Sequence, residues 1–100
     1  MSINVEVFSS PGCSKCKHAR DLLKKIALEK GEDCLHWREV NILQELDYAV
    51  SLGVLSTPAI AIDGQLVFTR LPSARKLESV LEAQIRKTQL HEAQLRPKGT

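Results

Sequence analysis

The chain has 100 residues, of which 43% are hydrophobic and 4% aromatic, so it predicts one small domain with a mostly aliphatic core. Fourteen basic residues against twelve acidic ones give a formal net charge of +2, a balance that argues against nucleic acid as a partner. The longest apolar run is far below the roughly 18 residues that a membrane span needs, so no membrane association is expected.

The first strand is predicted at residues 5–8, where Val5 to Phe8 form a β-branched and aromatic run. Residues 9–12 break this run. From Cys13 onward, apolar residues recur at spacings of three and four with charged residues between them, which indicates an amphipathic helix with one buried stripe. Gly31 is expected to cap this helix in the left-handed conformation.

A second strand is predicted at residues 35–40, which alternate between apolar and polar side chains. Asn41, with Gln44 three positions later, has the form of a capping box and predicts a helix that opens there and ends at Gly53. The residues of this helix that we expect to face the core are Leu43, Leu46, Ala49 and Val50.

The pair Asp63-Gly64 lies between two apolar runs, residues 59–62 and 65–68, and predicts a β-hairpin. Both turn residues of such a hairpin need a positive φ, which Asp and Gly tolerate.

A last helix is predicted to open at Pro72-Ser73 and to run on toward Pro97, with the final residues fraying. Its inner stripe is expected to hold Leu77, Val80, Leu81 and Ile85. We therefore expect a domain over residues 1–88 and a helix extension or frayed tail over 89–100.

The resulting order is β-α-β-α-β-β-α, which predicts an α/β fold with a four-stranded mixed sheet flanked by helices. The first crossover should be right-handed and should make the first two strands parallel. The hairpin then adds two strands that are antiparallel to each other.

The residues of greatest chemical interest are Cys13 and Cys16, at the predicted start of the first helix. The first N–H groups of a helix lack partners and carry the positive end of its dipole, so a thiolate on Cys13 is stabilised there. Lys15 and Lys17 add positive charge nearby. Cys16 follows one helical turn further on, where it is placed to attack a mixed disulfide on Cys13. We expect Cys13 to be the nucleophile and Cys16 the resolving thiol.

Two other interpretations of this pair remain open at this point. The cysteines could form a buried structural pair, or they could supply two of the four ligands that zinc prefers. The remaining ligands would then come from among Cys34, His18, His36 and His91. We favour a redox-active disulfide that needs neither a metal nor an organic cofactor.

Cysteine usage also bears on the compartment. Three cysteines is an odd number, which argues against the disulfide framework of a secreted domain. The first residues show no basic segment followed by an apolar run, as a signal peptide would. A cytoplasmic location is expected.

From Val5 to about Ile85 the chain resembles the thioredoxin superfamily. The run FSSPGCSKC, residues 8–16, is similar to the strand, loop and helix of glutaredoxins and small thioredoxin-like proteins. The run LGVLSTPA, residues 52–59, resembles the segment in which that family carries a cis-proline. The resemblance implies a thioredoxin-like fold with Pro58 cis, and a Thr57 backbone that pairs with an extended substrate segment.

The chain also departs from the best-known branches of that family. Thioredoxins carry a Trp before the first cysteine and a buried Asp six residues before it, where this chain has Gly12 and Val7. Glutaredoxins carry a glutathione-gripping Gly-Gly and acidic pattern, where this chain has residues 69–71, Thr-Arg-Leu. The resemblance therefore assigns no proton acceptor for Cys16 and does not imply the use of glutathione.

By this resemblance the chain is expected to be a monomeric thiol–disulfide oxidoreductase. It would reduce disulfides of proteins or small thiols through Cys13 and Cys16 and would draw electrons from a reductase. The alternative function is a protein-binding module of the same fold that the cysteine pair switches by oxidation, with little turnover.

Overall fold

The fold is seen in a computed structural model that describes residues 2–31 and 33–95. The elements follow the predicted order of strands and helices. They are β1 (Ile3–Ser9), α1 (Ser14–Lys30), β2 (Leu35–Asn41), α2 (Leu46–Leu52), β3 (Ala59–Ile62), β4 (Gln65–Phe68) and α3 (Ala74–Leu95).

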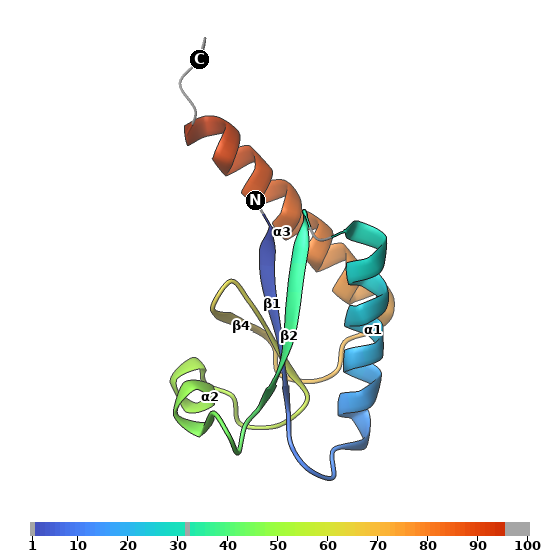
Figure 1. The fold of residues 1–100 in the computed structure, drawn as a ribbon, viewed down its shortest axis with the longest axis vertical. Coiled ribbons are helices and arrows are strands. Elements are labelled where there is room, and N and C mark those ends of the chain that lie inside the picture. The colour runs from blue at the N-terminus through green and yellow to red at the C-terminus, as the bar shows by residue number, and fades with distance from the viewer. Residues whose placement is uncertain (1, 32, 96–100) are drawn as a thin grey trace.

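The four strands form one mixed sheet in the order β2-β1-β3-β4. β1 and β2 are parallel, and β3 and β4 are antiparallel, as predicted. β3 joins the sheet by pairing antiparallel with β1. Helices α1 and α3 cover one face of the sheet and α2 covers the other, at the end where β1 leads into α1 (Figure 1). The α/β fold class is therefore confirmed.

The alternation of side chains along β1 builds two separate cores. Val5 and Val7 point into the larger core, which α1 and α3 complete with aliphatic side chains such as Leu23 and Leu81. Phe8 points the other way, into a smaller core beneath α2. Because β1 contributes to both cores, its carboxyl end, from which the next loop starts, is fixed between them.

The hairpin and the end of α1 show how local turn chemistry acts. Asp63 and Gly64 both have positive φ, 50° and 81°, so the predicted hairpin turn is confirmed. Gly31 does cap α1, and its N–H donates to the Ala27 carbonyl at 2.8 Å. Its φ of 87° and ψ of 159° are not left-handed helical, however, so the predicted conformation is wrong. The Gly31 carbonyl instead accepts from the N–H of Leu35, which leads the chain directly into β2.

The start of α2 differs from the prediction. Asn41 is not a helix cap, because its side-chain oxygen accepts from the Leu43 N–H at 2.9 Å in an Asx turn. The Asn41 carbonyl accepts from the N–H groups of Gln44 and Glu45, at 3.1 and 3.0 Å. This local bonding competes with helix formation, so α2 begins only at Leu46. Its predicted end at Gly53, which is left-handed, is confirmed.

The later start also changes which residues of α2 face the core. Ala49 is buried as predicted, but three of the four expected core residues are not. The exposed fractions of Leu43, Leu46 and Val50 are 66%, 54% and 63%. Tyr48 and Leu52 pack against the smaller core instead.

The last helix begins as predicted. The Ser73 hydroxyl accepts from the Lys76 N–H at 3.2 Å, and Leu77 and Leu81 are fully buried. α3 continues through Leu95, well past the sheet (Figure 1). Pro97 and the predicted fraying lie outside the described residues, and the division at residue 88 stays a prediction. No helix within residues 2–31 and 33–95 is both long and apolar enough to cross a membrane.

Candidate active site

The two cysteines lie where the loop after β1 enters α1, and they are bonded to each other as a disulfide. Cys13 is the N-cap residue of α1, and Cys16 lies in its first turn with a Cα–Cα distance of 5.4 Å between them. Cys13 is partly exposed, whereas Cys16 is 3% exposed. Gly12, directly before the pair, has a φ of +78°, which favours glycine at this turn. Of the two sulfur-bearing residues, Cys13 is thus the accessible one.

The charge around the start of α1 favours an anion. No acidic residue occupies the first turn of the helix, so the positive end of its dipole is not offset there. Lys15 and Lys17 are both exposed on this turn, close in the chain to Cys13. The predicted tuning residues are therefore placed on the same helical turn as the thiol they would influence.

A second segment reaches the cysteine loop from the start of β3. The Thr57–Pro58 peptide bond is cis, as the resemblance implied. The hydroxyls of Ser10 and Thr57 lie 2.7 Å apart and share a partly buried hydrogen bond. This bond joins the loop that carries Cys13 to the loop that carries the cis-proline.

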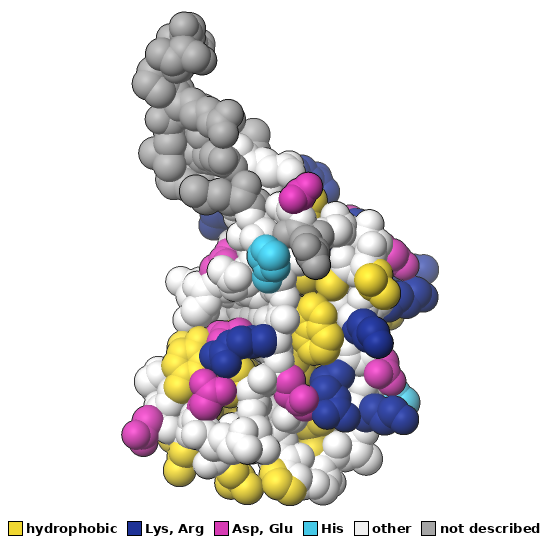
Figure 2. Space-filling model, in the orientation of Figure 1, with side chains coloured by type: hydrophobic (Ala, Val, Ile, Leu, Met, Phe, Trp, Pro, Cys, Tyr) yellow, Lys and Arg dark blue, Asp and Glu magenta, His cyan; other side chains and the backbone are white. Residues whose placement is uncertain are grey.

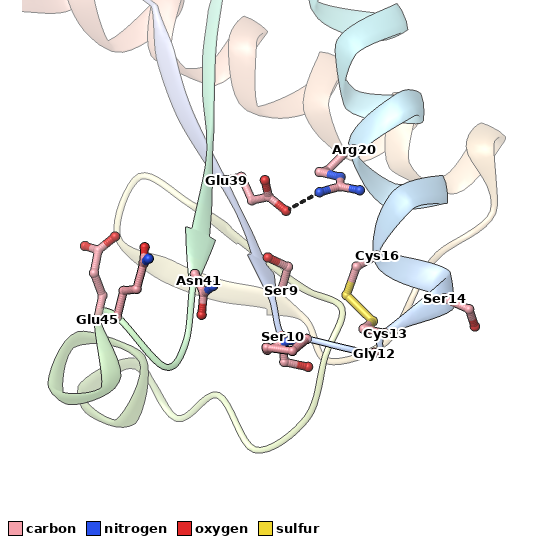
Figure 3. Close-up of a pocket in the computed structure, with 12 residues that line it drawn as sticks. Ser9, Ser10, Gly12, Cys13, Ser14, Cys16, Arg20, Glu39, Asn41 and Glu45 are labelled. Carbon is pink, nitrogen blue, oxygen red and sulfur yellow. Dashed lines mark hydrogen bonds and ion pairs between the residues drawn. A yellow bond between two sulfur atoms is a disulfide. The ribbon is translucent and has the colours of Figure 1, made fainter.

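A polar hollow of about 720 Å³ opens beside the disulfide (Figure 3). It is formed by the cysteine loop, the carboxyl ends of β1 and β2, and the turn before α2. Besides the two cysteines, its lining includes Ser9, Arg20, Glu39, Asn41, Gln44 and Glu45. An opening of this size and polarity accommodates a peptide segment or a small polar disulfide.

One ion pair crosses the hollow. The Arg20 guanidinium donates to the Glu39 carboxylate at 2.8 Å, which joins α1 to β2 one turn beyond Cys16 (Figure 3). Glu39 is the register partner of Val7, so a carboxylate stands one strand away from the position where thioredoxins carry a buried Asp. Val7 itself is fully buried and apolar.

A second charged cluster fixes α2 at the edge of the hollow. Arg38 pairs with Glu6 at 2.7 Å and with Glu45 at 3.2 Å, and the Tyr48 hydroxyl donates to Glu6. The bond with Glu45, followed by that with Glu6, raises the pKa of Arg38. The hydrogen bond to Glu6 raises the pKa of Tyr48. Since Glu45 also lines the hollow, the cluster ties the wall of the hollow to the sheet.

Sequence reasoning did not find Ser10, Arg20 or Glu39 as site residues. Arg20 follows Cys16 by four residues and so lies on the same face of α1, which is the one signal that would have pointed to it. Glu39 and Ser10 reach the site only through the sheet register and the packing of two loops.

Among the side chains that the structure describes, the alternative ligands for a metal do not gather around the cysteine pair. Within residues 2–31 and 33–89, no three His, Cys, Asp or Glu side chains are clustered so that they would hold a metal ion. Cys34 is a free thiol that packs against the larger core, and His18 and His36 are exposed. The side chain of His91 lies outside the described set.

The sequence is similar to known thioredoxins along most of its length. The sequence model of a family described as Thioredoxin domain matches residues 1–82. A probable thioredoxin of Methanothermobacter thermautotrophicus is 34% identical over 77 residues, which are 77% of this chain and 89% of that protein. A thioredoxin of Methanocaldococcus jannaschii is 24% identical over 83 residues, 83% of this chain and 96% of that one.

Solved structures agree on the fold. Thioredoxin 1 of Thermosipho africanus superposes with a TM-score of 0.70 at 19% identity, covering 86% of this chain and 98% of that one. A mutant thioredoxin of Halobacterium salinarum gives a TM-score of 0.68 at 18% identity, over 81% and 73% of the two chains.

Proposed function

The chain belongs to the thioredoxin domain family and is a thiol–disulfide oxidoreductase, and from that premise we propose that Cys13 is its nucleophile and Cys16 its resolving thiol. The observation that carries the assignment is the difference in exposure between the two residues. Cys13 is partly exposed at the helix N-cap, and Cys16 is 3% exposed behind it. A thiol that attacks a foreign disulfide must be accessible, whereas one that attacks its own neighbour need not be.

The reaction begins with the reduced pair. The Cys13 thiolate attacks one sulfur of a substrate disulfide, which forms a mixed disulfide and releases the other substrate sulfur as a thiolate. Cys16 then loses its proton to solvent and attacks the Cys13 sulfur. This step forms the Cys13–Cys16 bond and releases the second substrate thiolate. Two electrons have passed from the cysteine pair to the substrate, and the departing thiolates take up protons from water.

The neighbouring residues support this chemistry in distinct ways. The N–H groups and dipole at the start of α1, together with Lys15 and Lys17, favour the Cys13 thiolate over the thiol. Thr57 and Pro58 bind the substrate chain, with the backbone of Thr57 pairing with an extended segment in the manner of an added strand. The hydrogen bond between Ser10 and Thr57 supports this role, because it holds the binding segment against the cysteine loop.

Members of this family act on disulfides, use the redox-active disulfide itself and no external cofactor, and are reduced by a reductase. We assign to this chain a disulfide-bearing protein as substrate and a reductase as electron donor. We place the reaction in the cytoplasm, because the thiol pool of that compartment is reducing and a dithiol reductant has to be returned to its reduced form.

The test combines a potential with two variants. The protein is equilibrated in defined thiol–disulfide buffers and its free thiols are counted, and we expect a reversible two-electron couple at about −270 to −200 mV. Cys16→Ser should accumulate a mixed disulfide with insulin, a protein with accessible disulfides, whereas Cys13→Ser should form none. Insulin reduction that survives in Cys13→Ser would overturn the assignment of roles.

A further inference from the structure

A stripe of apolar side chains lies on the outside of α2 and of the turn before it. Leu43, Leu46 and Val50 are more than half exposed and follow one another at spacings of three and four residues. Leu46 and Val50 are four residues apart within α2 and so share one face of the helix, and Leu43 is exposed in the turn directly before it. We call these three residues the α2 stripe.

The core does not require the α2 stripe. The inner side of α2 is already filled by Tyr48, Ala49 and Leu52, which pack against the smaller core. Polar side chains would serve equally well on the outer side, yet large aliphatic ones occur there. Among the described residues, the other large hydrophobic side chains that are more than half exposed are Leu28, on α1, and Leu55, in the loop before β3. Two such residues on one short helix and a third in the turn before it form an exposed apolar patch of the kind that marks an interaction surface.

The α2 stripe adjoins the reacting end of the molecule. Gln44 and Glu45 come between Leu43 and Leu46 in the chain, and both line the hollow that contains the disulfide. In Figure 3 the start of α2 stands across this hollow from Cys13 and Cys16. Hydrophobic side chains gather on the surface at this end of the molecule, where Figure 1 places α2 and the cysteine loop (Figure 2).

We propose that the α2 stripe is a docking surface for the disulfide-bearing protein substrate. The proposal rests on the proposed function and adds the part of the surface that selects a protein over a small disulfide. Because the turn before α2 forms one wall of the hollow, a protein that brings its disulfide to Cys13 and occupies the hollow extends over this wall onto α2. A small disulfide fits within the hollow and does not reach the outer side of the helix. A second copy of the chain seated on the stripe would cover the rim of the hollow and hinder access to Cys13.

The test compares two substrates with the same pre-reduced protein. Single turnovers with insulin and with cystine are followed by the loss of free thiols, so that no other electron donor is needed. In the double variant Leu46→Ser and Val50→Ser, we expect the second-order rate constant with insulin to fall about fivefold or more. The rate constant with cystine should stay unchanged, because the cysteine pair and the hollow are untouched.

Leu28→Ser is the matched control, since Leu28 is 77% exposed on α1 near the end of that helix away from the cysteines. It should leave both rate constants unchanged. Substitutions of exposed side chains change stability little, so the double variant is expected to fold normally.

An unchanged rate with insulin would overturn the docking proposal, and so would an equal fall with both substrates. A dimer of the wild-type chain in sedimentation that the double variant abolishes would also overturn it, in favour of an interface between copies. These outcomes differ from a failure of the proposed function, in which the wild-type protein would react with neither substrate.

Discussion

Ser10 and Thr57 are 47 residues apart in the chain, yet their side-chain oxygens lie 2.7 Å apart. Ser10 belongs to the loop before α1 that carries Cys13, and Thr57 belongs to the loop before β3 that carries the cis-proline. The two halves of the proposed substrate site are therefore joined by one hydrogen bond as well as by the sheet beneath them.

The first prediction concerns this bond. Ser10→Ala should lower the free energy of unfolding by about 1 kcal/mol, the usual net contribution of a hydrogen bond, as measured by urea denaturation. Because Thr57 then loses its fixed position, the KM for insulin should rise several-fold. Thr57→Ser keeps a hydroxyl at that position, so its free energy of unfolding and its KM for insulin should stay close to those of the wild type. If Ser10→Ala loses stability while its KM is unchanged, the bond has a structural role only.

The second prediction concerns the larger core. Leu81 is fully buried between α3 and the sheet, so Leu81→Ala should lower the free energy of unfolding by about 2–5 kcal/mol. Leu28→Ala removes the same atoms from a side chain that is 77% exposed, and its effect should stay within about 0.5 kcal/mol. Urea denaturation of the two variants compares them directly, and similar losses would contradict the placement of α3.

The third prediction concerns pH. Lys30 and Glu82 join α1 to α3, and their hydrogen bond raises the pKa of Lys30 and lowers that of Glu82. The contribution of Glu82 is complete above its usual pKa of 4.5 and is lost as the pH falls through its lowered folded value. The contribution of Lys30 is complete below 10.5 and is lost as the pH rises through its raised folded value.

Thermal unfolding between acid and alkaline pH measures this dependence. Glu82→Gln should lower Tm most in the middle of the range and leave it closest to the wild type at both extremes. Glu78→Gln is the control, because Glu78 acts on Lys30 through charge alone. A loss in Glu82→Gln that is the same at every pH would show that the ion pair does not stabilise the fold.

The fourth prediction concerns the cluster that anchors α2. Arg38→Met would leave the largely buried Glu6 with Tyr48 as its remaining partner in the cluster, at a cost of about 1–3 kcal/mol in unfolding free energy. Arg38→Lys keeps the charge but cannot span Glu6 and Glu45 in the same way. Its free energy of unfolding should therefore lie between that of Arg38→Met and that of the wild type. Urea denaturation at neutral pH measures the series, and a neutral result for Arg38→Met would show that solvent satisfies Glu6.

The parts of the fold that the sequence predicted well depend on local chemistry. Asp63 and Gly64 supply the positive φ values of the hairpin, and Ser73 caps α3 through its own hydroxyl. The start of α2 was not predicted, because Asn41 has the composition of a capping box but bonds within an Asx turn. The two arrangements use the same side-chain oxygen, and the choice between them depends on how the turn meets the sheet.

The residues of the candidate site also fall into those that local sequence predicts and those that it does not. Cys13 and Cys16 are neighbours in the chain, and their place at a helix start could be derived from the sequence. The pairing of Arg20 with Glu39 depends on how α1 lies over β2, which no local pattern encodes. Residues that meet only through packing of distant elements therefore had to come from the structure.

The length of α3 has a practical consequence. The helix carries the chain away from the sheet at the end opposite the cysteine loop (Figure 1). A bead, an electrode or a carrier protein attached beyond Leu95 would leave the disulfide pointing outward and open to its reaction partners. Attachment at the loop before α1 would instead cover the disulfide. Immobilisation through the far end of α3 is therefore the arrangement to choose for a surface-bound assay.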